Sequence, residues 1–78
     1  MNQKLKELVE FGADIEFCCR DKEYTILPWT NDGIVISEKN GEDHIFESYE
    51  DMINKYKIED VLLKDILNEI EITFTSGC

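Results

Sequence analysis

The sequence predicts a two-layer α+β domain in which helices cover one face of a mainly antiparallel sheet. Apolar residues recur every second position through much of residues 14–47, which is the period of strands. Before and after that stretch they recur every third or fourth position, which is the period of helices. Short turns join the expected strands, and strands joined in this way pair antiparallel. The expected order over one domain, residues 1–78, is α-β-β-β-β-α-α-β.

The first expected element is a helix over residues 3–11. Its leucines and Val9 fall on one helical stripe. Asn2 is a candidate N-cap, and Gly12 stands where a left-handed C-terminal cap is needed.

Two strands follow over residues 14–20 and 23–29, with a turn expected at Asp21-Lys22. Alternation places these residues on one face of their strands: Ile15, Phe17 and Cys19 in the first, Tyr24 and Ile26 in the second. Pro28 cannot donate a ladder hydrogen bond, so we expect it at a strand end or a sheet edge.

The next hairpin carries the strongest turn signal in the chain. Strands expected over 34–38 and 44–47 flank Asn40-Gly41, a dipeptide typical of type I′ turns. Such a turn needs a positive φ at both central residues.

The remaining elements are two helices and a last strand. Ser48, with Asp51 three residues later, resembles a capping box in which aspartate replaces the usual glutamate. The helix after Ser48 is expected from the helical spacing of Tyr49, Met52, Ile53 and Tyr56. A second helix is expected over 60–68, with Glu59-Asp60 at its start, where negative charge interacts well with the helix dipole. Residues 70–75 alternate, which predicts a strand with these residues on one face: Ile70, Ile72 and Phe74.

The charge balance restricts the class of partner. Eighteen acidic residues against eight basic ones give a formal net charge of −10. Residues 1–37 hold seven acids and four bases, and residues 38–78 hold eleven acids and four bases. A negative field repels phosphates and anionic lipids and attracts basic surfaces. We therefore expect a protein partner with a basic surface, no direct nucleic-acid binding and no membrane association.

The three cysteines form neither a disulfide framework nor a metal site. Cys18 and Cys19 are adjacent, so on a strand they point to opposite faces, and no pair has the C-x₂₋₄-C spacing of zinc ligands. Cys78 is expected to be exposed. The polar run after Met1 lacks the apolar segment of a signal peptide. We expect a cytoplasmic protein with reduced thiols, no metal and no cofactor.

His44 is the only histidine, the residue type that titrates near neutral pH. Pairing of His44 with Cys18 across the sheet, with one carboxylate, would give a small enzyme or ligand-binding domain. The acidic surroundings disfavour a thiolate, and the chain has no phosphate-binding glycine loop or nucleophile elbow. We therefore expect a protein without catalytic activity and keep the pair as the alternative.

Two regions are candidates for partner contact. Trp29 precedes a polar turn, and tryptophan is enriched at interfaces because it adds large area at low entropic cost. The alternative is that Trp29 closes one end of a small core. The second candidate is an acidic patch around the Asn40-Gly41 hairpin and the helix start: Glu42, Asp43, Glu47 and Glu50. Its alternative is an ordinary solvated surface.

The hairpin pattern I-x-F-x-x-x-x-K-x-Y-x-I and the tail YK-I…L-K-D-I-L-x-E-I carry a resemblance. They resemble a group of small uncharacterised proteins of low-GC Gram-positive bacteria and their prophages. The resemblance covers most of the chain and implies no catalytic or binding residues. Small acidic proteins of phages and mobile elements often occupy basic sites on host enzymes, as anti-CRISPR inhibitors do. The resemblance therefore implies a small acidic inhibitor that occupies a basic site on a partner protein, without pointing to any particular inhibitor.

Three functions remain open on the sequence alone. The first is a small acidic interaction protein that occupies a basic surface of a partner. The second is the enzyme or ligand-binding domain that uses Cys18 and His44. The third is a structural subunit whose sheet edge pairs with a second copy in a weak homodimer.

Overall fold

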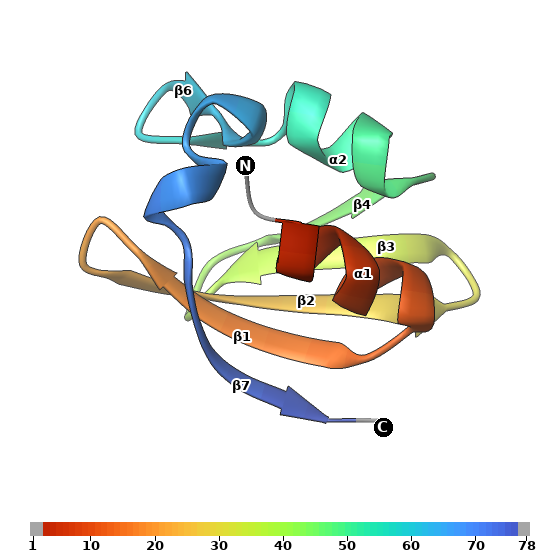
Figure 1. Ribbon diagram of the computed structural model, residues 1–78. Helices are drawn as coiled ribbons and strands as arrows, with labels where there is room; N and C mark the ends of the chain where they lie inside the picture. Colours follow the sequence, from red (N-terminus) through yellow and green to blue (C-terminus); the bar gives the residue numbers. More distant parts are fainter. Residues whose placement is uncertain (1–2, 77–78) are drawn as a thin grey trace.

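The computed structural model describes residues 3–76 and confirms the α+β class, with one five-stranded antiparallel sheet and two helices (Figure 1). The elements follow in this order: α1 (Gln3–Phe11), β1 (Asp14–Cys19), β2 (Lys22–Thr30), β3 (Gly33–Glu38), β4 (Asp43–Phe46), α2 (Tyr49–Lys55), β5 (Lys57–Ile58), β6 (Val61–Leu62), the 3₁₀ turns η1 (Leu63–Asp65) and η2 (Leu67–Glu69), and β7 (Glu71–Ser76). The spatial order of the sheet is β4-β3-β2-β1-β7, so the chain returns after α2 to add its last strand beside β1.

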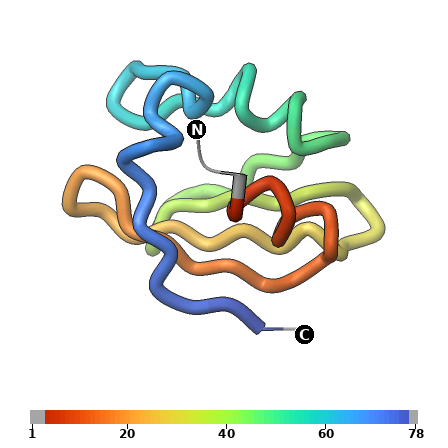
Figure 2. The backbone as a smooth tube through the Cα atoms, viewed as in Figure 1, coloured from red at the N-terminus to blue at the C-terminus, as the bar shows by residue number. Residues whose placement is uncertain are grey.

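The helices, the β5–β6 ribbon and the 3₁₀ turns form one layer above the sheet (Figure 2). The core lies between the two layers and contains these fully buried side chains: Leu5, Ile15, Phe17, Cys19, Ile26, Ile36, Met52, Ile58, Leu63 and Ile66. Within it the rings of Phe17 and Tyr24, which are cross-strand partners, stack 5.1 Å apart. The expected inward faces of the first two strands are therefore confirmed.

Local signals at the two α-helices are confirmed where the structure describes them. Gly12 ends α1 with a φ of 91°. The Ser48 side chain accepts a hydrogen bond from the Asp51 N–H (3.0 Å), and Asp51 Oδ2 accepts one from the Glu47 N–H (3.3 Å). The expected cap at Asn2 lies outside the described residues, as does Cys78.

Two hairpin turns differ from the expectation. The β1–β2 turn is centred on Arg20-Asp21, one residue earlier than expected, and both residues have positive φ (53° and 66°). In the β3–β4 turn only Asn40 has a positive φ (69°), and the Gly41 N–H donates to the Glu38 carbonyl (2.7 Å). The type I′ prediction was therefore wrong, because a longer loop separates the strands.

Pro28 lies inside a central strand rather than at a sheet edge. The pairing of β2 with β3 is irregular between Leu27 and Thr30, and Pro28 falls within that irregularity. A residue without an N–H is tolerated there because the ladder is already interrupted.

The expected helix over residues 60–68 was wrong. Glu59 and Asp60 both have positive φ (52° and 68°) and form the turn of the β5–β6 ribbon instead of a helix start. Two 3₁₀ turns follow, and they bury Leu63 and Leu67. Apolar spacing of three and four residues fits successive 3₁₀ turns as well as an α-helix, so the spacing could not separate the two.

The last strand contains a bulge that reverses one side chain. Phe17 pairs with Ile72, but its neighbour Glu16 pairs with Phe74, which leaves one extra residue in β7. Ile72 faces the core, whereas Phe74 lies on the opposite face and is 52% exposed. The expectation that these two residues share a face was therefore wrong.

Candidate functional site

The face of the main sheet that turns away from the helices is uncovered in the described part of the chain. In Figures 1 and 2, the helices, the ribbon and the 3₁₀ turns all lie on the other side. We call this surface the open face and define it by these outward side chains of the five strands: Asp14, Glu16, Cys18, Glu23, Thr25, Leu27, Trp29, Val35, Ser37, Asp43, Ile45, Glu71, Phe74 and Ser76.

An apolar row crosses one end of the open face. Val35 pairs with Ile45 on one side and with Leu27 on the other. Ile45 is 52% exposed, and the other two are half-buried. Trp29 extends the row, is 60% exposed, and donates its indole N–H to the side chain of Asp14. Trp29 therefore belongs to this surface and does not close the core.

Five carboxylates share the open face with that row: Asp14, Glu16, Glu23, Asp43 and Glu71. No outward strand position within residues 3–76 carries a lysine or an arginine. Lys39 reaches in from the β3–β4 hairpin, where its Nζ lies 3.3 Å from Glu23 Oε2. The open face therefore combines exposed apolar area with unbalanced negative charge.

The basic residues gather on the opposite side of the molecule or at its turns. Most lysines belong to α1, α2, the ribbon or η1. Arg20 lies at the β1–β2 turn, and its guanidinium contacts Glu69 (2.9 Å) and Glu59 (3.6 Å). The hydrogen bond from Arg20 holds the pKa of the Glu69 carboxyl below its ordinary value. These pairs tie the sheet to the upper layer. Among the acids of the open face, the structure of residues 3–76 gives an ion pair only to Glu23, with Lys39.

The structure separates the acidic residues that the sequence grouped around Ser48. Glu42 and Asp43 lie at one end of β4, whereas Glu47 and Glu50 follow its other end, about 13 Å away along the strand. Of these four, only Asp43 belongs to the open face.

Asp51, next to that group, is committed to the helix. Its carboxylate bonds Lys55 Nζ (2.8 Å) and accepts from the Glu47 N–H. The bond to Lys55, followed by the bond from Glu47, lowers the pKa of Asp51. This side chain therefore caps α2 and is not free for a partner.

Cys18 and His44 do not form a site together. Cys18 lies on the outward side of β1, and His44 lies on the inward side of β4, opposite Ile36. Three strand spacings, about 14 Å, separate the two strands. Cys19 is buried, and its burial raises the pKa of the thiol. Residues 3–76 also contain no group of His, Cys, Asp and Glu side chains arranged to hold a metal ion.

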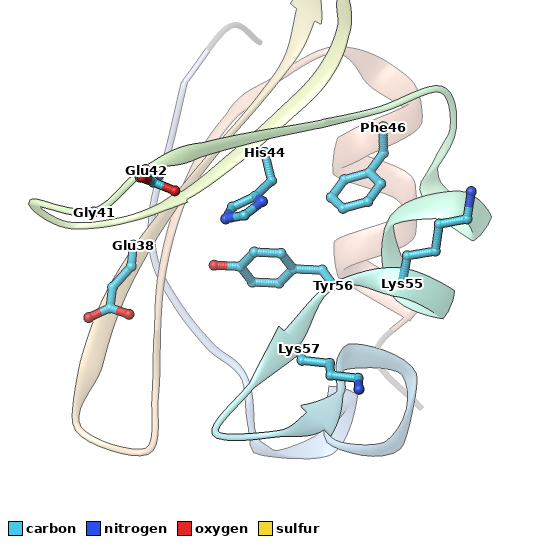
Figure 3. Close-up of a pocket in the computed structure, with 8 residues that line it drawn as sticks. All are labelled: Glu38, Gly41, Glu42, His44, Phe46, Lys55, Tyr56 and Lys57. Atoms are coloured by element: carbon cyan, nitrogen blue, oxygen red, sulfur yellow. The ribbon is translucent and has the colours of Figure 1, made fainter.

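His44 instead borders a cavity of about 410 Å³ beside α2 (Figure 3). The cavity is lined by these residues: Glu38, Gly41, Glu42, His44, Phe46, Lys55, Tyr56 and Lys57. The Tyr56 ring lies 5.4 Å from the His44 ring and 6.3 Å from the Phe46 ring, both nearly edge-on. Burial, and then the charge of Glu38, raises the pKa of Tyr56, so its phenol stays neutral at physiological pH.

The sequence pointed to two residues of the open face, Trp29 and Asp43, but to neither the whole surface nor the cavity. The signal for the open face was present, since Glu16 and Leu27 alternate with the inward residues of β1 and β2. The cavity had a weaker signal, because His44 and Phe46 are two residues apart while Tyr56 comes from a different element.

Comparisons with protein-family models, with curated proteins and with solved structures find no match for this chain. The resemblance to small Gram-positive and prophage proteins stays a prediction. Neither helix in residues 3–76 is long and apolar enough to cross a membrane. The open face and the cavity are therefore the features of the molecule that bear on its function.

Proposed function

We propose that this protein is a non-enzymatic binding module whose open face docks on a basic surface of a partner protein. One observation carries the proposal: a whole sheet face is uncovered, bears an apolar row, and carries five carboxylates with no outward base among the described strands. Protein interfaces commonly have an apolar centre with a polar rim. The negative charge of the rim in this protein favours a partner that has lysines and arginines around its own apolar patch.

Trp29 and Ile45 are the expected centre of such an interface. Both are large and more than half exposed, and they stand at the two ends of the apolar row. Tryptophan side chains are among the residues that most often dominate binding energy. The carboxylates around them would speed association and select against acidic partners.

Occupation of a basic surface would block whatever that surface normally binds. If the partner uses it to hold a nucleic acid, this protein would act as an inhibitor without contacting the nucleic acid itself. Cys18 and Cys19 are free thiols, which suits a reducing compartment, and we propose a cytoplasmic location on that ground.

The test compares two charge-reversed variants in capture from cell lysate. Glu16→Lys with Asp43→Lys changes the open face, and Glu7→Lys with Glu50→Lys makes the same charge change on the two helices. We expect a basic protein that the native chain and the helix variant retain and the open-face variant loses. Retention should fall between about 0.15 M and about 0.5 M salt, where screening is much stronger.

The captured protein is then purified and titrated against this chain while the fluorescence of Trp29 is followed. Trp29 is the only tryptophan and lies on the open face, so docking there should shift its emission to shorter wavelength. Equal capture by both charge-reversed variants, or an unchanged Trp29 signal in a saturated complex, contradicts the proposal.

A further inference from the structure

The edge strand β4 borders two surfaces at once. Asp43 and Ile45 point to the open face, whereas His44 and Phe46 point inward, where they pair with Ile36 and Ile34 and meet the ring of Tyr56. A partner that covers the open face and wraps around this edge therefore reaches the cavity beside α2.

The cavity has an acidic end and a basic end. In Figure 3, Glu38, Glu42 and His44 surround the hydroxyl end of Tyr56, while the amino groups of the two lysines lie toward the other side. Lys55 is held there by Asp51, at 2.8 Å.

The two glutamates at the acidic end are available to a ligand. Neither Glu38 nor Glu42 takes part in an ion pair within residues 3–76. At the other end of the cavity, Lys57 is the one lining lysine without an ion pair within residues 3–76. The cavity therefore has two unpaired carboxylates and one unpaired lysine, which leaves a net negative charge.

We propose that this cavity binds an arginine side chain of the basic partner, with its guanidinium between Glu38, Glu42 and the Tyr56 hydroxyl and beside the His44 ring. The inference rests on the proposed function in one respect, because it takes the partner to be a basic protein. A guanidinium is planar, offers five N–H donors, and stacks on aromatic rings, so it suits a site with carboxylates on one side and rings on the other. The space of about 410 Å³ is open to solvent on one side and has room for one arginine side chain.

The probe for the test is N-acetyl-arginine amide, which carries one positive charge. It is titrated into the purified protein while the NMR signals of the His44 and Tyr56 rings are followed. We expect saturable shifts of both rings. The citrulline analogue, which has the same shape without the charge, should cause much smaller shifts.

The double variant Glu38→Gln with Glu42→Gln should bind the probe about three- to tenfold more weakly, as expected for the loss of two exposed charge contacts. Asp65→Asn in η1 removes an exposed acid outside the cavity and should leave the affinity unchanged. The spectrum of each variant also reports whether the fold is intact. Equal binding of the citrulline analogue, or equal affinity in the double variant, overturns the inference.

The variant Trp29→Ala separates this inference from the proposed function. It alters the open face and should lose the captured partner, yet it should keep its affinity for the arginine amide, because Trp29 does not line the cavity. Loss of partner capture in Trp29→Ala, with no probe binding to the native cavity, leaves the proposed function standing and removes the inference. If instead the native cavity binds the probe and Trp29→Ala still captures the partner, the docking of the open face is contradicted and the arginine site in the cavity stands.

Discussion

The two faces of the same sheet contrast sharply. On the covered face the central strands bury Ile15, Phe17, Ile26 and Ile36 completely. On the open face the residues that alternate with them are half-buried or exposed, and several are carboxylates. Because side chains alternate along a strand, one strand supplies the core with one set of residues and presents an independent set to solvent. If the open face binds a partner as proposed, stability and recognition can therefore be changed separately in this protein.

The largest expected difference in stability is between alanine substitutions of two phenylalanines, one on each face of the sheet. Phe17→Ala should cost about 3–5 kcal/mol of unfolding free energy, because Phe17 is fully buried and stacks on Tyr24. Phe74→Ala should cost less than about 1 kcal/mol, because Phe74 is 52% exposed on the open face. Urea unfolding measures both values. Similar losses would show that the open face is covered in solution.

The next difference concerns alkaline pH. Burial raises the pKa of Tyr24 to about 12 from 10.0, so the neutral phenol stabilises the fold. That contribution is complete below pH 10 and is lost as the pH rises toward 12. Tyr24→Phe should reduce the fall in stability over this range, measured by urea unfolding at several pH values. Thr25→Ala, its neighbour on the open face, should leave the fall unchanged.

A smaller effect is expected at the cap of α2, which belongs to the covering layer. Ser48→Ala should cost about 1 kcal/mol, because the Asp51 N–H loses its acceptor. Ser48→Gly should cost only a few tenths of that unit. Thermal unfolding of the two variants checks the order, and equal values would mean that the hydroxyl bond contributes nothing. Asp51→Lys should also lower stability, since it breaks the bonds to Glu47 and Lys55.

The smallest effect on stability is expected from Glu42→Lys with Asp43→Lys. Both residues are exposed and outside the caps, so the double change should alter unfolding free energy by less than about 0.5 kcal/mol. Association with a basic partner should slow markedly while dissociation changes less, because exposed charges act mainly on the encounter. Stopped-flow kinetics with the partner from the capture experiment measures both rates. Unchanged association would remove this end of β4 from the interface.

Local patterns in the sequence were sufficient for α1, the first four strands and α2. Each has a signal within a few residues, such as Gly12 after the first helix or Ser48 with Asp51 at the second. Where the outcome depended on a distant segment, the sequence was insufficient. The bulge that turns Phe74 outward forms only against Glu16 and Phe17 of β1.

The candidate site shows the same division. Trp29 and Asp43 were identified from sequence and lie on the open face. Glu47 and Glu50 are close to them in sequence but not in space, because β4 runs between the two ends of the group.

The sequence by itself determined the net charge, the strand period that sorts inward from outward residues in β1 to β4, the Gly12 end of α1 and the Ser48 cap of α2. These features depend on composition and on neighbours along the chain. Only the tertiary structure decided that Ile45, Val35 and Leu27 form one row, and that β7 joins β1. It alone also placed Tyr56 beneath His44. These features depend on strand order and on which face the helices cover, and both are set by how distant segments bury their apolar surface together.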